Sequence, residues 1–169
     1  MLARIVRHLT FPQSPAHNTA KVHGDYKQGN FFFSPTGEIS VFDWQWTGPG
    51  IGATDLIYVC VMALSDDTLA DYENTVLKVY YEHLAATLGS RDKYCYEAFV
   101  REFKLATLDY QRWQGGSRCP SMTPASVKNG CEVVDVNHGI YRRSVARNVW
   151  TWKLVDAILD EIDRGEFKL

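Results

Sequence analysis

Residues 22–33, VHGDYKQGNFFF, bring an acid and an amide together directly before three phenylalanines. Asp25 and Asn30 stand five positions apart, a spacing that is too tight for one face of a strand and that suits a loop. A second acid, Asp43, lies near the end of the run EISVFDW at 38–44. If the two apolar runs pair as a hairpin, Asp43 returns close to Asn30 and Asp25.

This grouping has the residue types that phosphoryl transfer needs. Asn30 and Asp43 offer hard oxygen ligands, which Mg²⁺ takes together with phosphate oxygens. Asp25 could accept the proton of an attacking hydroxyl, and Lys27 could extend over the same loop toward a transferred phosphate. Each residue alone is more often a cap or a solvated charge. The hypothesis of an active-site loop depends on their combination at this spacing.

The elements that must position these residues are two short strands and a helix. The runs at 30–33 and 38–44 are separated by Ser34-Pro35-Thr36-Gly37, a typical four-residue hairpin connection. Residues 48–53, GPGIGA, are expected to form a flexible loop. Thr54 or Asp55 could cap the apolar helix that follows, to about Leu64.

The three phenylalanines of the first strand, Phe31, Phe32 and Phe33, are expected to be core residues that hold the loop against the helices.

The rest of the chain has helical periodicity. Apolar residues recur at steps of three and four over 69–84, 99–113 and 141–162, while residues 114–137 give the weakest signal for regular structure. The pattern predicts one α+β domain over 1–169 that is predominantly α-helical, with a small β-hairpin carrying the loop and no alternating β/α sheet. Its parts are a tail of helix and loop at 1–22, the loop and hairpin at 22–55, and a helical region at 56–169.

Composition limits the class of partner. The chain has 169 residues, 46% of them hydrophobic, and a net charge of −2, so neither a nucleic acid nor an anionic membrane is expected. The apolar run Leu56–Leu64 is about half of the ~20 residues that cross a membrane. The four cysteines include no CxxC pair and are read as reduced thiols, so we expect a cytoplasmic location.

Three motifs resemble those of known small-molecule kinases. HGDYKQGN at 23–30 resembles the HGDxxxxN catalytic loop of the aminoglycoside and choline kinase group. VFDWQ at 41–45 resembles the metal-binding segment of the ecdysteroid kinase-like branch, where Asp-Phe-Gln is usual and Trp44 replaces the Phe. GATDL at 52–56 resembles the element that follows in that family. The resemblance covers roughly residues 21–60 and implies the C-terminal lobe of a protein-kinase-like fold.

The resemblance also implies roles for single residues. Asp25 would be the catalytic base, and Asn30 and Asp43 would be the Mg²⁺ ligands of an ATP- and Mg²⁺-dependent kinase with a small-molecule alcohol as substrate. Lys27 would contact a phosphate. The remaining motif residues, His23, Gly24 and Asp55, would support the loop.

Only 22 residues precede His23, and they contain no strand-rich nucleotide lobe with a paired Lys and Glu. We therefore expect a C-terminal lobe alone, which a separate N-terminal lobe or a protein partner could complete. The alternatives are a non-catalytic binding module or truncated pseudokinase of the same fold and, less favoured, a Mg²⁺-dependent hydrolase.

Residues outside the motifs give weaker signals. Asp109, Trp113 and Asp135 are candidate contacts for a basic substrate, although packing in a helical core is the commoner use of Trp113, Trp150 and Trp152. Arg142, Arg143 and Arg147 are expected on a solvated helix face. Gly48, Gly50 and Ala53 match a dinucleotide-binding fingerprint, but no second strand follows and Pro49 removes a backbone donor. Sterol, choline-like and aminoglycoside hydroxyls all remain open as substrates.

Overall fold

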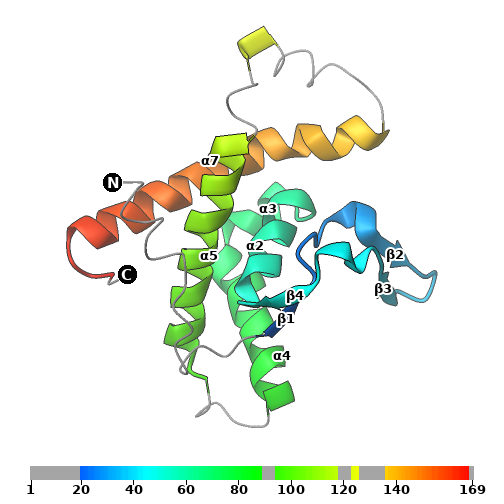
Figure 1. The fold of residues 1–169 in the computed structure, drawn as a ribbon, viewed down its shortest axis with the longest axis horizontal. Coiled ribbons are helices and arrows are strands. Elements are labelled where there is room, and N and C mark those ends of the chain that lie inside the picture. Colours follow the sequence, from blue (N-terminus) through cyan, green and yellow to red (C-terminus); the bar gives the residue numbers. More distant parts are fainter. Residues whose placement is uncertain (1–19, 89–93, 118–122, 126–135, 168–169) are drawn as a thin grey trace.

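The computed structural model describes residues 20–88, 94–117, 123–125 and 136–167, which form a mostly helical α+β fold with two small antiparallel sheets. Figure 1 shows α5 and the long α7 crossing each other, with the shorter helices beside them and the β2–β3 hairpin projecting to one side. Residues 1–19 of the tail expected over 1–22 and the candidate contact Asp135 fall outside the described residues, and the end of that tail is a strand, β1 (Ala20–Val22), rather than helix or loop.

The predicted hairpin is present. Strands β2 (Phe31–Phe33) and β3 (Ile39–Val41) pair antiparallel, with Phe31 opposite Val41. Its turn is closed by a hydrogen bond from the Gly37 N–H to the Ser34 carbonyl (3.0 Å). This register places Phe42 beside Asn30, whose carbonyl accepts the Phe42 N–H at 3.1 Å.

The expectation of a flexible loop over 48–53 is wrong at its first half. Gly48–Gly50 forms strand β4, which pairs antiparallel with β1 (Ala20–Val22). Glycine allows the two strands to approach closely, because a Cβ on Gly50 would lie 3.0 Å from the Val22 side chain. The segment therefore joins the hairpin to the strand that leads into the catalytic loop motif.

The helices follow the predicted stripes with different bounds. They are α2 (Ala53–Met62), α3 (Asp66–Ala70), a π-helical segment (Glu73–Lys78) continuous with α4 (Val79–Leu88), α5 (Tyr96–Ser117) and α7 (Val136–Asp163). The helix predicted from the apolar stripe over 69–84 is thus divided among α3, the π-helical segment and α4. Ser65 caps α3 by accepting the Thr68 N–H. The α5 helix also continues into the segment that was expected to lack regular structure.

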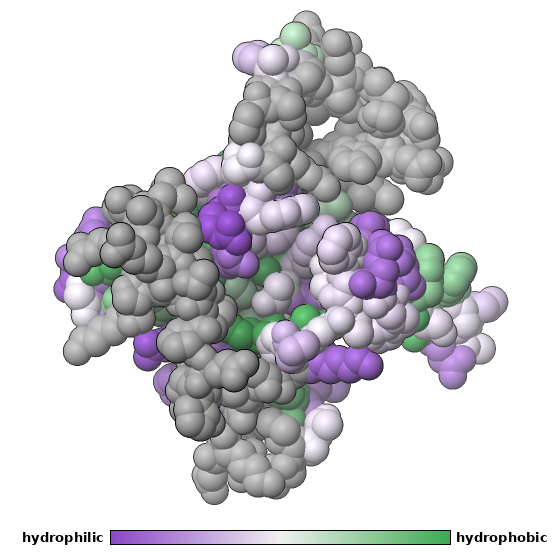
Figure 2. All heavy atoms as spheres, viewed as in Figure 1, coloured by the Kyte–Doolittle hydropathy of each residue, from purple (hydrophilic) through white to green (hydrophobic). Residues whose placement is uncertain are grey.

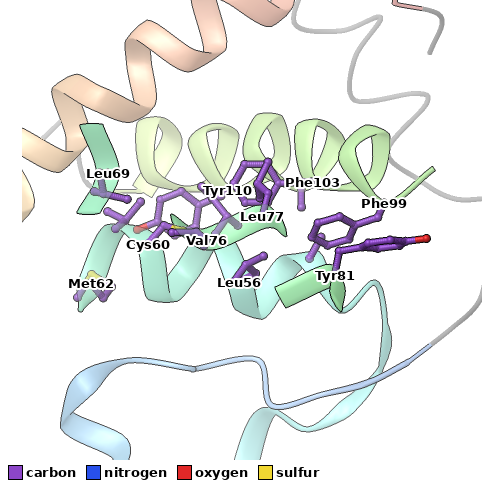
Figure 3. Close-up of a cluster of buried hydrophobic side chains, with 14 of the residues drawn as sticks. Leu56, Cys60, Met62, Leu69, Val76, Leu77, Tyr81, Phe99, Phe103 and Tyr110 are labelled. Atoms are coloured by element: carbon purple, nitrogen blue, oxygen red, sulfur yellow. The ribbon is translucent and has the colours of Figure 1, made fainter. Parts of the chain in front are cut away.

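Helix α2 lies at the centre of the core. Ile57, Cys60 and Val61 have no exposed surface, and they pack with Phe99 and Phe103 of α5. Figure 3 shows side chains of α2, α4 and α5 meeting between the helices. Burial raises the pKa of the Cys60 thiol to about 12, as expected for a small core residue rather than a reactive one.

The phenylalanines of β2 do not behave as predicted. Phe32 and Phe33 are 64% and 59% exposed, and only Phe31 is partly buried, against Tyr26 with ring centroids 4.7 Å apart. The reason is that the hairpin projects from the helical body instead of packing along it (Figure 1). Figure 2 shows hydrophobic atoms on that outer end of the molecule.

The expectations for Arg147 and for two of the three tryptophans also need correction. Arg147 is only 3% exposed rather than solvated, and its Nε lies 3.7 Å from Asp66 Oδ1, because α7 crosses α2 and α3 at this point. Trp150 packs against the core, whereas Trp113 and Trp152 are 41% and 44% exposed. Among the described helices, none is both long enough and apolar enough to cross a membrane.

Candidate active site

The carboxylate of Asp25 is the centre of the candidate site. Asp25 is 8% exposed and lies between β1 and a short 3₁₀ turn, Gln28–Asn30. Its Oδ2 accepts hydrogen bonds from Lys27 Nζ at 2.5 Å and from Asn30 Nδ2 at 3.1 Å. The structure thus brings together Asp25, Lys27 and Asn30 of the loop motif, with both donors within hydrogen-bonding distance of one carboxylate oxygen.

Asp55 holds the backbone of this loop from the first turn of α2. Its Oδ2 accepts the His23 N–H at 2.7 Å, and its Oδ1 accepts the Gly24 N–H at 2.9 Å. A carboxylate is also favoured at this point of a helix, because the N-terminus carries partial positive charge. One side chain therefore fixes two consecutive peptide groups immediately before Asp25.

His23 joins the loop to the end of the hairpin. Its ring is buried, its Nδ1 accepts the Asp25 N–H at 3.2 Å, and its Nε2 lies 2.8 Å from the Phe42 carbonyl. Since Nδ1 accepts a hydrogen bond, Nε2 carries the proton and donates it to that carbonyl. The imidazole thus connects the backbone of Asp25 to the residue before Asp43.

Gly24 has a conformation and a position that exclude a side chain. Its φ is +83°, and a Cβ there would lie 2.6 Å from the Trp46 carbonyl oxygen. The loop therefore turns against the backbone of the segment after β3, where a larger residue would collide.

Asn30 and Asp43 offer oxygen atoms on the hairpin side of the loop. Asn30 is buried, and its Nδ2 is directed to the carbonyl and carboxylate of Asp25, which leaves Oδ1 for a cation. Asp43 is exposed and adopts a left-handed conformation (φ 64°) directly after Phe42, the neighbour of Asn30. One amide oxygen and one carboxylate fit the few protein ligands that Mg²⁺ takes beside phosphate oxygens.

A larger cluster of metal-binding side chains is not found. Within residues 20–88, 94–117, 123–125 and 136–167, no three or more His, Cys, Asp or Glu side chains are grouped so that they could hold a metal ion. The role of Asn30 and Asp43 as metal ligands therefore stays a prediction.

The pKa of Asp25 reflects two opposing effects. Burial raises it, but the hydrogen bond and positive charge of Lys27, with further hydrogen bonds from Asn30 and Tyr58, outweigh burial and bring the pKa below its ordinary value. Asp25 is therefore ionised at neutral pH and able to accept a proton.

A pocket of about 500 Å³ opens beside Asp25 on the side of α5. Its lining residues are Gly24, Asp25, Lys27, Trp46, Thr54, Tyr58, Asp109, Tyr110 and Trp113. Two of the weaker sequence candidates, Asp109 and Trp113, therefore lie at the same pocket as the loop. Asp109 also pairs with Arg112, whose Nη2 is 2.8 Å from Oδ1. Asn30 and Asp43 do not line this pocket.

Sequence reasoning missed Tyr58 and Tyr110 as pocket residues. Tyr58 stands three residues after Asp55, on the same face of α2, and this spacing was a signal that could have placed it near the loop. Tyr110 is adjacent to Asp109 and one turn before Trp113, but its place depends on how α5 packs against α2.

The chain matches one known protein family. Residues 1–92 match the ecdysteroid kinase-like family, and since this is more than half of the chain, the protein belongs to that family. Comparison with curated proteins and with solved structures gave no match.

Proposed function

We propose that this chain carries the acceptor-binding and metal-binding residues of an ATP- and Mg²⁺-dependent phosphotransferase that acts on a small-molecule alcohol. Membership of the ecdysteroid kinase-like family supports the kinase class and a protein-kinase-like C-terminal lobe as the fold. The observation that carries the proposal is the buried, ionised Asp25 at the wall of a pocket of about 500 Å³.

In the proposed reaction, Asp25 receives the proton of the acceptor hydroxyl. The alcohol oxygen forms a bond to the γ-phosphorus while the bond from that phosphorus to the β–γ bridging oxygen breaks, and ADP leaves with the electron pair. A carboxylate suits this task because it orients the hydroxyl and accepts its proton as the new bond forms.

Lys27 would serve as the phosphate contact in this reaction. Its Nζ contacts Asp25, and its side chain is 38% exposed, so it can extend toward an incoming phosphate. A hydroxyl that replaces the ammonium at Oδ2 would release Lys27 for that contact. The ammonium would then balance negative charge on the transferred group.

The hairpin residues have the donor atoms for the metal. When bound, Mg²⁺ supplies positive charge that offsets the charge of the phosphates. Asn30 would hold it through Oδ1 and Asp43 through its carboxylate, while Asn30 Nδ2 continues to anchor Asp25. His23 connects the loop to the hairpin, because its ring contacts both the Asp25 N–H and the Phe42 carbonyl next to Asp43.

The pocket composition favours an organic acceptor over water. Trp46, Tyr58, Tyr110 and Trp113 supply aromatic surface beside Asp25, and such surface binds the carbon framework of a ligand. An ATP hydrolase, whose acceptor is water, would need no aromatic acceptor pocket beside Asp25.

An assay with the protein made from its complete coding sequence tests the proposal. Protein, Mg²⁺ and ATP are incubated with and without a panel of sterol, amino-alcohol and aminoglycoside acceptors, and ADP and phosphate monoester are measured. We expect ADP release only when an accepted alcohol is present, and none after Mg²⁺ is removed by chelation. Equal ADP release without an alcohol would indicate a hydrolase, and ligand binding with no turnover of any acceptor would indicate a binding module.

A further inference from the structure

Helix α2 reaches the candidate catalytic loop through two side chains, and only one of them belongs to a sequence motif. Asp55 binds the backbone N–H groups of His23 and Gly24. Tyr58 follows three residues later, so both side chains project from the same face of the helix. The first turns of α2 are thus placed to hold the side chain of Asp25 as well as the backbone before it.

A side-chain hydrogen bond from Tyr58 is the smallest of the effects that lower the pKa of Asp25. Both residues line the same pocket, so this contact is made at the surface where an acceptor would bind. Lys27 and Asn30 approach the carboxylate from within the loop, whereas Tyr58 approaches it from a helix of the core. A hydrogen bond from Tyr58 would therefore hold Asp25 from a position that does not depend on the loop itself.

The ring of Tyr58 is held in turn by α5. It lies edge-on to Tyr110, with centroids 5.6 Å apart and an interplanar angle of 82°, and its centroid is 6.4 Å from that of Trp113. Helices α2 and α5 pack closely along their length, so these contacts fix the direction of the phenol. A fixed phenol restricts the terminal torsion of Asp25, which is otherwise broad for a carboxylate.

We propose that Tyr58 is a positioning residue that orients the Asp25 carboxylate toward an acceptor hydroxyl in the pocket. The inference rests on the proposed phosphotransferase function. Tyr58 itself takes no proton in the reaction; its role is to keep the accepting oxygen at the angle that transfer requires, from a position that the loop cannot shift.

The substitution Tyr58→Phe tests this directly, because it removes the hydroxyl and keeps the ring against Tyr110 and Trp113. We expect kcat to fall by on the order of ten-fold, since one hydrogen bond to a charged group is lost, while KM for ATP stays unchanged. The control is Tyr81→Phe, which also removes a buried hydroxyl, in this case one that donates to the Tyr94 carbonyl at 2.7 Å, away from the pocket. The control should keep the kcat of the unsubstituted protein, and an equal kcat in Tyr58→Phe would overturn the proposal.

A second measurement does not depend on turnover or on the folding of the Tyr58 variant. Tyrosines labelled with ¹³C at Cζ are observed by NMR in the unsubstituted protein and in Asp25→Asn. Loss of the charged acceptor should move the Tyr58 resonance and leave that of Tyr81 in place. An unmoved Tyr58 resonance would overturn the positioning role. If instead the resonance moves but no alcohol is phosphorylated, the contact stands and the phosphotransferase function fails.

Discussion

At the scale of single residues, two neighbours define the candidate site. Gly24 does so because it has no side chain, and Asp25 does so because its carboxylate is charged. Gly24 lets the chain turn against the Trp46 backbone, and the next residue then enters a buried position where several donors converge on its carboxylate. A motif of this kind constrains neighbouring residues for different reasons. The glycine requirement is steric, whereas the aspartate requirement is chemical.

Gly24→Ala should lower the free energy of unfolding by about 2–3 kcal/mol, because the new Cβ adds a collision to the strain of a positive φ. The control is Gly37→Ala, since Gly37 also has a positive φ (+86°) but a Cβ there would meet no atom within 4 Å. It should lose only about 1–2 kcal/mol. Urea denaturation of both variants gives the comparison. Equal losses would show that the loop does not depend on close contact with Trp46.

At the scale of elements, α2 connects the core to the loop. Its buried face carries Ile57 and Cys60, while Asp55 and Tyr58 reach the loop. The hairpin is connected to the same loop through His23 and the Phe42 carbonyl. The helix and the hairpin are therefore coupled by the few residues around Asp25.

Asp55→Ala should loosen the loop without unfolding the helix. Hydrogen bonds to a charged group contribute about 1.5–3 kcal/mol, so protection of the His23 and Gly24 amides against hydrogen exchange should fall by at least about ten-fold. Asp67→Ala is the matched control, because Asp67 is an exposed acid in the first turn of α3. It should leave both amides protected. Unchanged exchange in Asp55→Ala would contradict the bracing role.

At the scale of the whole molecule, the sequence predicted those structural features that depend on residues close together in the chain. The hairpin register follows from a four-residue turn between two apolar runs, and the contacts among Asp25, Lys27 and Asn30 lie within one loop. The helical stripes identified most helices for the same reason. Their exact bounds depended on caps and on packing that periodicity does not describe.

What could not be predicted depends on how the elements pack together. Phe32 is exposed because the hairpin projects from the helices, and Arg147 is buried because α7 crosses α2 and α3. Tyr58 reaches Asp25 only because α2 is rotated so that this face meets the loop. The pocket likewise needs Asp109 and Trp113 from α5, a helix that is distant in the sequence.

The most direct test of the proposed function is phosphate transfer by the Asp25→Asn variant. The protein made from its complete coding sequence is given Mg²⁺, ATP and an accepted alcohol, and ³¹P NMR follows the phosphate monoester and ADP. Loss of a general base costs on the order of 10²–10⁴-fold in rate, so Asp25→Asn should retain about 1% of turnover or less with an unchanged circular dichroism spectrum. The exposed Asp67→Asn should remain fully active. Turnover by Asp25→Asn close to that of the unsubstituted protein would contradict the account.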